Sequence, residues 1–156
     1  MNGFRALALG SAAGGGLPQW NCGCANCVAA RDPDSSIRPQ TQSSLAVSVD
    51  GLNWSLLNAS PDMRTQLADN AALHPKTLRG SPVRNVILTN GDIDHIAGLL
   101  ILRERHAFTI HATPHIAALL RENSVFAVLD PELVTVREVD LATPFELQPG
   151  LTAEIV

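Results

Sequence analysis

The sequence has few charged residues and no long apolar run, and both shortages narrow the kinds of partner it can have. Charged residues make up 17% of its 156 residues, and eleven Lys and Arg are scattered among fifteen Asp and Glu for a net charge of −4. This distribution forms no basic face, so we predict no binding to nucleic acid and no electrostatic attraction to a membrane. An apolar stretch of the roughly 20 residues that a membrane-spanning helix needs is missing as well.

Cysteine is scarce too, and its three occurrences all lie between positions 22 and 27. The apolar segment from Phe4 to Leu9 is broken by Gly10 and Gly14–Gly16, which leaves no apolar core of the roughly 7–15 residues typical of a secretory signal peptide. We therefore expect a cytoplasmic protein, in which thiols stay reduced. Reduced cysteines this close together favour metal ligation over disulfides.

Cys22, Cys24 and Cys27 are predicted to form a knuckle around a structural zinc ion, because zinc prefers tetrahedral sulfur and imidazole ligands. Gly23 is expected to let the backbone bend between the first two thiolates. The simpler alternative is three buried or redox-inert cysteines. Three thiolates leave one ligand missing. It could be water, come from sequence this chain lacks, or be one of four histidines that the spacing does not distinguish: His74, His106, His111 and His115.

The remaining pattern predicts one α/β layered domain, since 46% of the residues are hydrophobic and strand and helix signals alternate. Trp20 and Trp54 are expected to be packing residues. The last predicted strand reaches the end of the sequence, so we expect the domain to be incomplete. Strands are predicted at 5–9, 44–58 (a hairpin), 83–89, 108–111, 134–139 and 151–156, and helices at 60–69, 96–104 and 113–121.

A second cluster follows the apolar strand that ends at Thr89. Asp92, Asp94 and His95 lie in the loop after this strand, where α/β proteins place their functional sites. Two carboxylates and an imidazole can hold a hard or borderline divalent cation, although the same aspartates could simply cap a helix. The Gly14–Gly16 stretch lacks the features of a phosphate-binding loop, so we expect its backbone to approach the metal loop closely.

The motif Asp94-His95-x2-Gly98-Leu99 resembles the second half of the His-x-His-x-Asp-His motif of the metallo-β-lactamase superfamily. Asn90 and Asp92 stand where that motif has its two leading histidines, and Asn58-Ala59-Ser60 falls where the superfamily usually has an Asp-x-Gly turn that supports the metal loop. Three longer stretches resemble the coenzyme PQQ synthesis protein B family: residues 14–22, 38–44 and 57–62.

The resemblance implies an αββα sandwich, of which residues 1–156 are the N-terminal half, with the knuckle at 22–27. In phosphonate-pathway phosphodiesterases of the same fold, a distant histidine completes a similar zinc site, and we expect the counterpart of that histidine to be missing from this half. A half-domain would leave one sheet face in water, which costs on the order of 10 kcal/mol for several hundred Å² at ~25 cal/mol per Å². We therefore expect a partner chain to cover that face.

For function, the resemblance implies a role in the biosynthesis of pyrroloquinoline quinone (PQQ). Three hypotheses remain open at this point. The first is an oxygenase in which Asp92, Asp94 and His95 bind iron and act on a tyrosine-bearing precursor. The second is a metal-dependent hydrolase, which the missing leading histidines disfavour. The third is a non-catalytic carrier that binds and transports the quinone or its precursor.

Overall fold

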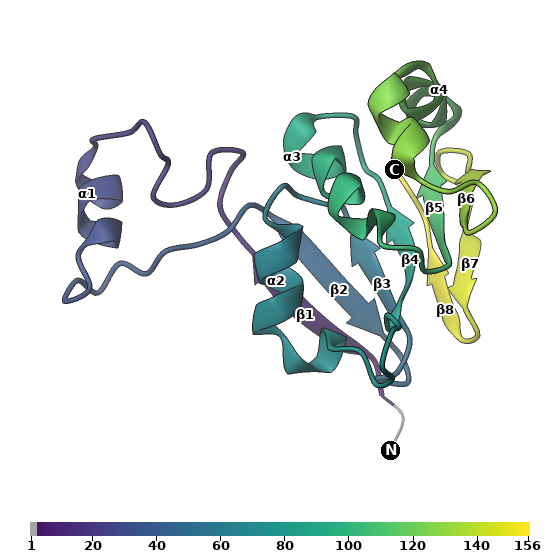
Figure 1. Ribbon diagram of the computed structural model, residues 1–156, viewed down its shortest axis with the longest axis horizontal. Helices are drawn as coiled ribbons and strands as arrows, with labels where there is room; N and C mark the ends of the chain where they lie inside the picture. Colours follow the sequence, from purple (N-terminus) through teal and green to yellow (C-terminus); the bar gives the residue numbers. More distant parts are fainter. Residues whose placement is uncertain (1–2) are drawn as a thin grey trace.

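The computed structural model describes residues 3–156 and is built around a six-stranded mixed sheet (Figure 1). The strands follow one another in chain order across the sheet, so each connection joins direct neighbours. The first three pair antiparallel, whereas β3 to β6 are parallel and are joined by helical crossovers. Their bounds are β1 Arg5–Gly10, β2 Ser44–Ser48, β3 Trp54–Leu57, β4 Val83–Ile87, β5 Phe108–Ala112 and β6 Val134–Glu138.

Helices cover one face of this sheet and bury the main core. Leu56, Val86 and Ile110 point from neighbouring strands into it, and Met63 and Leu99 meet them from the helices with no exposed surface. The helices on this face are α2 Met63–Asp69, α3 Ile93–Ile96 and α4 Pro114–Glu122, with 3₁₀ helices at Ala71–Leu73, Ala97–Arg103 and Ser124–Val128, whereas α1 Ala25–Arg31 lies apart from it.

A short hairpin packs on the opposite face of the sheet. It consists of β7 Phe145–Gln148 and β8 Leu151–Ala153, and its Phe145 forms a second core with Ile87. Near β1 the same face is uncovered, since Ala6 and Ala8 are exposed. The expectation of a fully open face is therefore wrong for the part under the hairpin and holds only toward the β1 edge.

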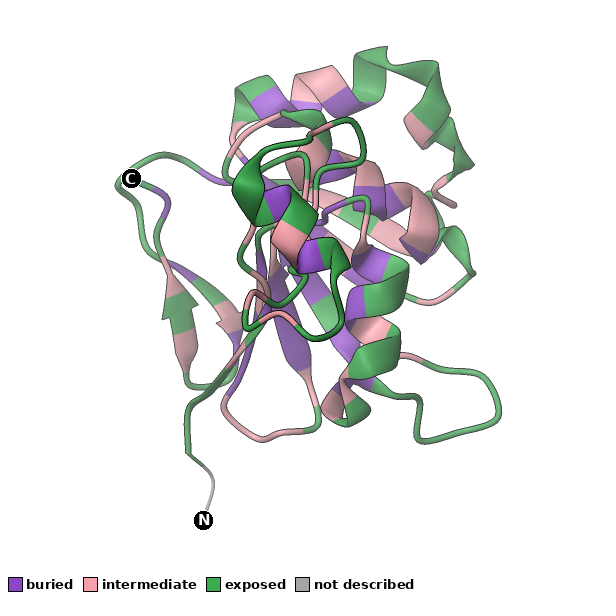
Figure 2. Ribbon diagram, turned by 90° about the vertical axis from the view of Figure 1, so that its left-hand side faces the viewer, coloured by how far each residue is buried: buried purple, intermediate pink, exposed green. Residues whose placement is uncertain are grey.

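Residues 11–43 form an arm that leaves the β1 edge of the sheet and carries α1 away from the other helices (Figure 1). Trp20 lies on this arm with 87% of its surface exposed, so the prediction that it packs inside is wrong. Trp54 is 1% exposed in the main core, as predicted. The cysteine cluster at α1 thus lies outside the packed body, while the Asp/His loop at α3 lies on it (Figure 1). Figure 2 shows buried residues gathered in the sheet and in the helices that cover it.

All the predicted strands are present, and the errors concern helix starts and short elements. Helix α2 begins at Met63 rather than at Pro61, because the buried Ser60 hydroxyl donates to Oε1 of Gln66 instead of capping the helix. The helix predicted from Ile96 begins three residues earlier and continues as a 3₁₀ helix. The last strand ends at Ala153, and α1 and β7 were not predicted. No helix among residues 3–156 is both long and apolar enough to cross a bilayer.

Candidate metal sites

The three cysteines converge at the start of α1. Cys24 occupies the N-cap position of that helix, Cys27 is 5% exposed in its first turn, and Cys22 lies just before it. Their sulfur atoms lie within 4.8 Å of one another. In a tetrahedral site with Zn–S bonds of about 2.3 Å the sulfurs lie about 3.8 Å apart, so small side-chain rotations would bring three sulfurs this close onto a shared zinc ion.

Arg31, which the sequence analysis did not single out, holds the knuckle in shape. Its guanidinium donates to the carbonyl oxygens of Cys22 (2.9 Å), Cys27 (3.2 Å) and Gln19 (2.7 Å). It therefore ties the last turn of α1 to the segment that carries the first thiol. In the sequence, Arg31 is only a basic residue four positions after Cys27. Such a spacing is too common to predict that the side chain supports the knuckle. Gly23 has open space around it and no positive φ, so the bend there does not require glycine.

Cys24 and Cys27 differ in pKa because their surroundings differ. The Cys27 backbone N–H, followed by hydrogen bonds from the Cys22 and Cys27 side chains, lowers the pKa of Cys24 to about 7. At Cys27 a backbone hydrogen bond at Gln19 acts to lower the pKa, but burial and the neighbouring thiols together raise it above its ordinary value. Cys24 is therefore the thiol most ready to lose its proton and bind a metal.

None of the four candidate histidines completes the knuckle. Within residues 3–156, no His, Asp or Glu offers a ligand atom to the cluster of three sulfurs. His111 is buried in β5, where Nε2 lies 3.0 Å from Oδ1 of Asn85, and His115 lies on α4. His106 stacks on Phe108 and His74 contacts the Ala68 carbonyl oxygen. The remaining alternatives for the fourth ligand are water or sequence outside this chain.

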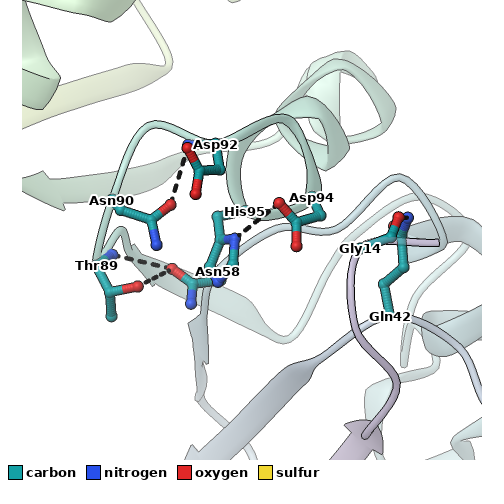
Figure 3. A network of polar contacts seen from close by, with 8 residues as sticks. All are labelled: Gly14, Gln42, Asn58, Thr89, Asn90, Asp92, Asp94 and His95. Atoms are coloured by element: carbon teal, nitrogen blue, oxygen red, sulfur yellow. Dashed lines mark hydrogen bonds and ion pairs between the residues drawn. The ribbon is translucent and has the colours of Figure 1, made fainter. Parts of the chain in front are cut away.

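Asp92, Asp94 and His95 form the second cluster, with ligand atoms within 4.8 Å of one another (Figure 3). Asp92 precedes α3, and the other two residues lie in its single turn. Nδ1 of His95 lies 3.1 Å from Oδ1 of Asp94, yet it is shielded from solvent and has no hydrogen-bond partner. A buried ring nitrogen without a partner is costly, and a metal ion shared with the two carboxylates would satisfy it.

Two asparagines shape the loop that carries this cluster. Oδ1 of Asn90 accepts the backbone N–H of Asp92 (3.0 Å). Oδ1 of Asn58, a residue with φ of 62°, accepts both the backbone N–H (2.9 Å) and the hydroxyl (3.1 Å) of Thr89. Asn90 thus folds the loop where the superfamily motif has a histidine ligand. Asn58 supports it, as the resemblance implied.

Helix α3 is fixed to the turn after β3 by its backbone. The Ala59 N–H donates to the His95 carbonyl (2.7 Å), and the Gly98 N–H donates to the Ala59 carbonyl (2.8 Å). A Cβ at Gly98 would lie 2.2 Å from the Ser60 carbonyl oxygen, so only glycine permits this approach. The position of His95 therefore depends on a glycine three residues away.

The glycine stretch of the arm meets the same loop. A Cβ on Gly14 would lie 3.0 Å from Oδ2 of Asp94, and the Gly14 carbonyl accepts a hydrogen bond from the Gln42 amide (Figure 3). This confirms the predicted close approach of the glycine backbone to the loop. It also places the start of the arm beside the Asp/His cluster.

The six-stranded mixed sheet, the helices on one face and the Asp/His loop after β4 define a member of the metallo-β-lactamase fold. Residues 53–156 match the family described as "Beta-lactamase superfamily domain", so the chain belongs to that superfamily. Within it, the chain is 57% identical over 152 residues to coenzyme PQQ synthesis protein B of Rhizobium meliloti, with 97% of this chain and 50% of the relative aligned. The resemblance fits the N-terminal half of that protein.

Two solved structures extend the comparison. Zn²⁺-bound PqqB from Methylobacterium extorquens is 53% identical with a TM-score of 0.93, over 96% of this chain and 54% of that one. A diphosphatase of the PhnP family is 22% identical with a TM-score of 0.70, over 92% and 53%, which shows the shared fold alone. The chain spans about half the length of the curated relatives it matches. Its cysteine cluster fits zinc, the metal named for the first of these structures.

Proposed function

We propose that this chain contributes to PQQ biosynthesis as the metal-binding half of an oxygenase that hydroxylates a tyrosine-bearing precursor. The observation that carries the proposal is the convergence of Asp92, Asp94 and His95, in which the buried Nδ1 of His95 lacks a hydrogen-bond partner. The link to PQQ comes from the relatives at 53–57% identity that are named for its synthesis.

The chemistry of the donor set supports iron over zinc at this loop. Two carboxylates and one imidazole are a hard to borderline set, and three ligands leave coordination positions open. Zinc hydrolases rely on more imidazole, and here the first of the two leading motif positions is Asn90, whose side-chain oxygen is used by the Asp92 N–H. Because the Asn90 oxygen already accepts the Asp92 N–H, it is also less able to serve as a metal ligand in a metal-dependent hydrolase.

Iron bound at this site would supply activation of dioxygen. The net reaction would place one oxygen atom on an aryl carbon, reduce the other to water and consume two electrons from an external reductant such as ascorbate. The chain's own residues orient the site: Asn58 and Asn90 fix the loop, and Gly98 lets α3 lie against the turn after β3.

The test is anaerobic loading with Fe²⁺, followed by metal analysis and exposure to air, ascorbate and a tyrosine-containing peptide. We expect close to one iron per chain and a product heavier by one oxygen atom. Asp94→Asn should remove most of the iron, whereas Glu122→Gln, an exposed carboxylate at the end of α4, should retain it. Zinc bound only at the knuckle, together with quinone binding and no turnover, would overturn the proposal in favour of a transport role.

A further inference from the structure

We propose that a cavity beside the Asp/His loop binds the part of the substrate that carries an aromatic ring and an aliphatic amine, with Asp140 holding the ammonium group. The cavity has a volume of about 570 Å³. Its walls are Thr89 and Asn90 after β4, residues 113–116 at the start of α4, and Asp140 and Leu141 after β6. It lies at the carboxyl ends of parallel strands, where open α/β sheets bind ligands. The assignment of the substrate rests on the proposed function.

The cavity adjoins the loop that carries the Asp/His cluster. Asn90 lines the cavity and accepts the N–H of Asp92. Between them, Gly91 packs directly on α4, since a Cβ there would lie 2.9 Å from Cδ1 of Leu119 and 3.4 Å from Cδ1 of Ile116. The loop that carries the metal ligands and the helix that forms the cavity wall are therefore one packed unit. A ligand in the cavity would contact Asn90, two residues before the first member of the Asp/His cluster.

The lining specifies the kind of ligand. Pro114, Ile116 and Leu141 provide apolar walls, and Leu141 leaves 60% of its surface exposed, which suits an aromatic ring. Asp140 is exposed, and within residues 3–156 its carboxylate forms no ion pair. The nearest basic side chain along α4, Arg121, is paired with Glu138 at 2.8 Å.

Asp140 therefore brings an unpaired carboxylate to the wall of the cavity. A carboxylate attracts an ammonium group and repels another carboxylate. A ligand with an aromatic ring and an amine matches both the apolar walls and the negative charge of Asp140, whereas an aromatic acid matches only the walls. His115 adds a ring nitrogen at the rim for one further hydrogen bond.

The test uses two probes that share a phenol ring, L-tyrosine amide and 3-(4-hydroxyphenyl)propanoate, titrated into the zinc-loaded, ¹⁵N-labelled chain. We expect L-tyrosine amide to shift the amide signals of Thr89, Thr113 and Leu141. Asp140→Asn should weaken its binding about two- to fivefold, the range of a solvent-exposed ion pair, without weakening binding of the acid. Leu141→Ser should weaken both probes, and Glu122→Gln neither.

Saturable shifts confined to another surface, no saturable shift, or equal affinities of the wild type and Asp140→Asn would overturn the inference. The spectra themselves report whether each variant is folded. Failure of the chain to bind iron would contradict the proposed function while leaving this binding result standing. If the chain bound iron but Asp140→Asn bound L-tyrosine amide as tightly as the wild type does, only the cavity assignment would be contradicted.

Discussion

At the scale of single residues, Arg31 explains how three cysteines on an exposed arm keep one arrangement. Its guanidinium joins three carbonyl oxygens on both sides of the knuckle, at 2.7–3.2 Å. A planar fork with five donors can do this, whereas the ammonium of lysine cannot match the same geometry. Replacing a residue that orients metal ligands, even one that does not touch the metal, typically lowers the affinity for the metal.

Arg31→Ala is therefore expected to weaken zinc binding about 10- to 100-fold, the usual effect of losing a supporting contact. Competition with a chromophoric chelator measures the affinity. Arg38→Ala is the matched control, because Arg38 lies on the same arm and its guanidinium donates to the Pro33 carbonyl rather than to the knuckle. Equal zinc affinities for the wild type and Arg31→Ala would show that Arg31 does not support the site.

Cys24 is expected to be the first thiol to react in the metal-free chain. Because its pKa is lowered to about 7, alkylation by iodoacetamide should reach half its maximal rate near pH 7, about two units below the ordinary value for a cysteine thiol. Peptide mass spectrometry over pH 5–10 gives the profile. Cys27, buried and with a raised pKa, should react later. A Cys24 midpoint near 9 would contradict this, and Cys24→Ser should in any case lower the zinc content.

At the scale of elements, α3 positions the Asp/His cluster, and a single turn has little stability of its own. It is held by the two backbone hydrogen bonds that join Ala59 to His95 and Gly98. The cluster is thus a property of the contact between α3 and the turn after β3. Neither element could hold it alone.

Gly98→Ala is expected to destabilise the fold by about 1–3 kcal/mol and to lower metal affinity at the cluster, because the added Cβ would lie 2.2 Å from the Ser60 carbonyl oxygen. Urea unfolding and metal analysis measure the two effects. Gly23→Ala is the control, since a Cβ there meets nothing within 4 Å. If Gly98→Ala bound iron and unfolded like the wild type, the docking of α3 would not position the cluster.

At the scale of the whole molecule, a buried polar group links the sheet to the hairpin that covers it. His111 is 2% exposed, stacks on Phe145 of β7, and contacts Asn85, which donates to the Leu147 carbonyl at 3.0 Å. Burial, with a smaller contribution from Arg137, lowers the pKa of His111 to about 4. The neutral ring is therefore the form that the packed hairpin requires.

This depressed pKa makes the stability depend on pH. The unfolded state, with an ordinary pKa of 6.5, binds more protons between pH 6.5 and 4 than the folded state does, so stability falls as the pH decreases through this range. We expect a loss of about 2 kcal/mol between pH 7 and pH 5 from this group. Urea unfolding at both pH values measures it. His111→Asn should reduce the loss, and an equal loss in the variant would assign it to other groups.

The sequence by itself determined the sheet strands, because their apolar and β-branched runs allow little else. It also identified both clusters of candidate metal ligands that the structure brings together, because those residues are close neighbours in the chain. The superfamily motif likewise placed Asn58 and Gly98 correctly. Local patterns could not reveal α1, whose seven residues are stabilised by the knuckle, or the true start of α2, where Ser60 bonds to Gln66 across the turn.

Only the tertiary structure decided what surrounds the two clusters. It placed Arg31 under the cysteines, set the backbone of Gly14 against Asp94, and left the four histidines away from the knuckle. It also brought Asp140, some 50 residues along the chain, to a cavity shared with Asn90. The cavity joins segments distant in sequence, because parallel strands bring their carboxyl ends to one edge of the sheet.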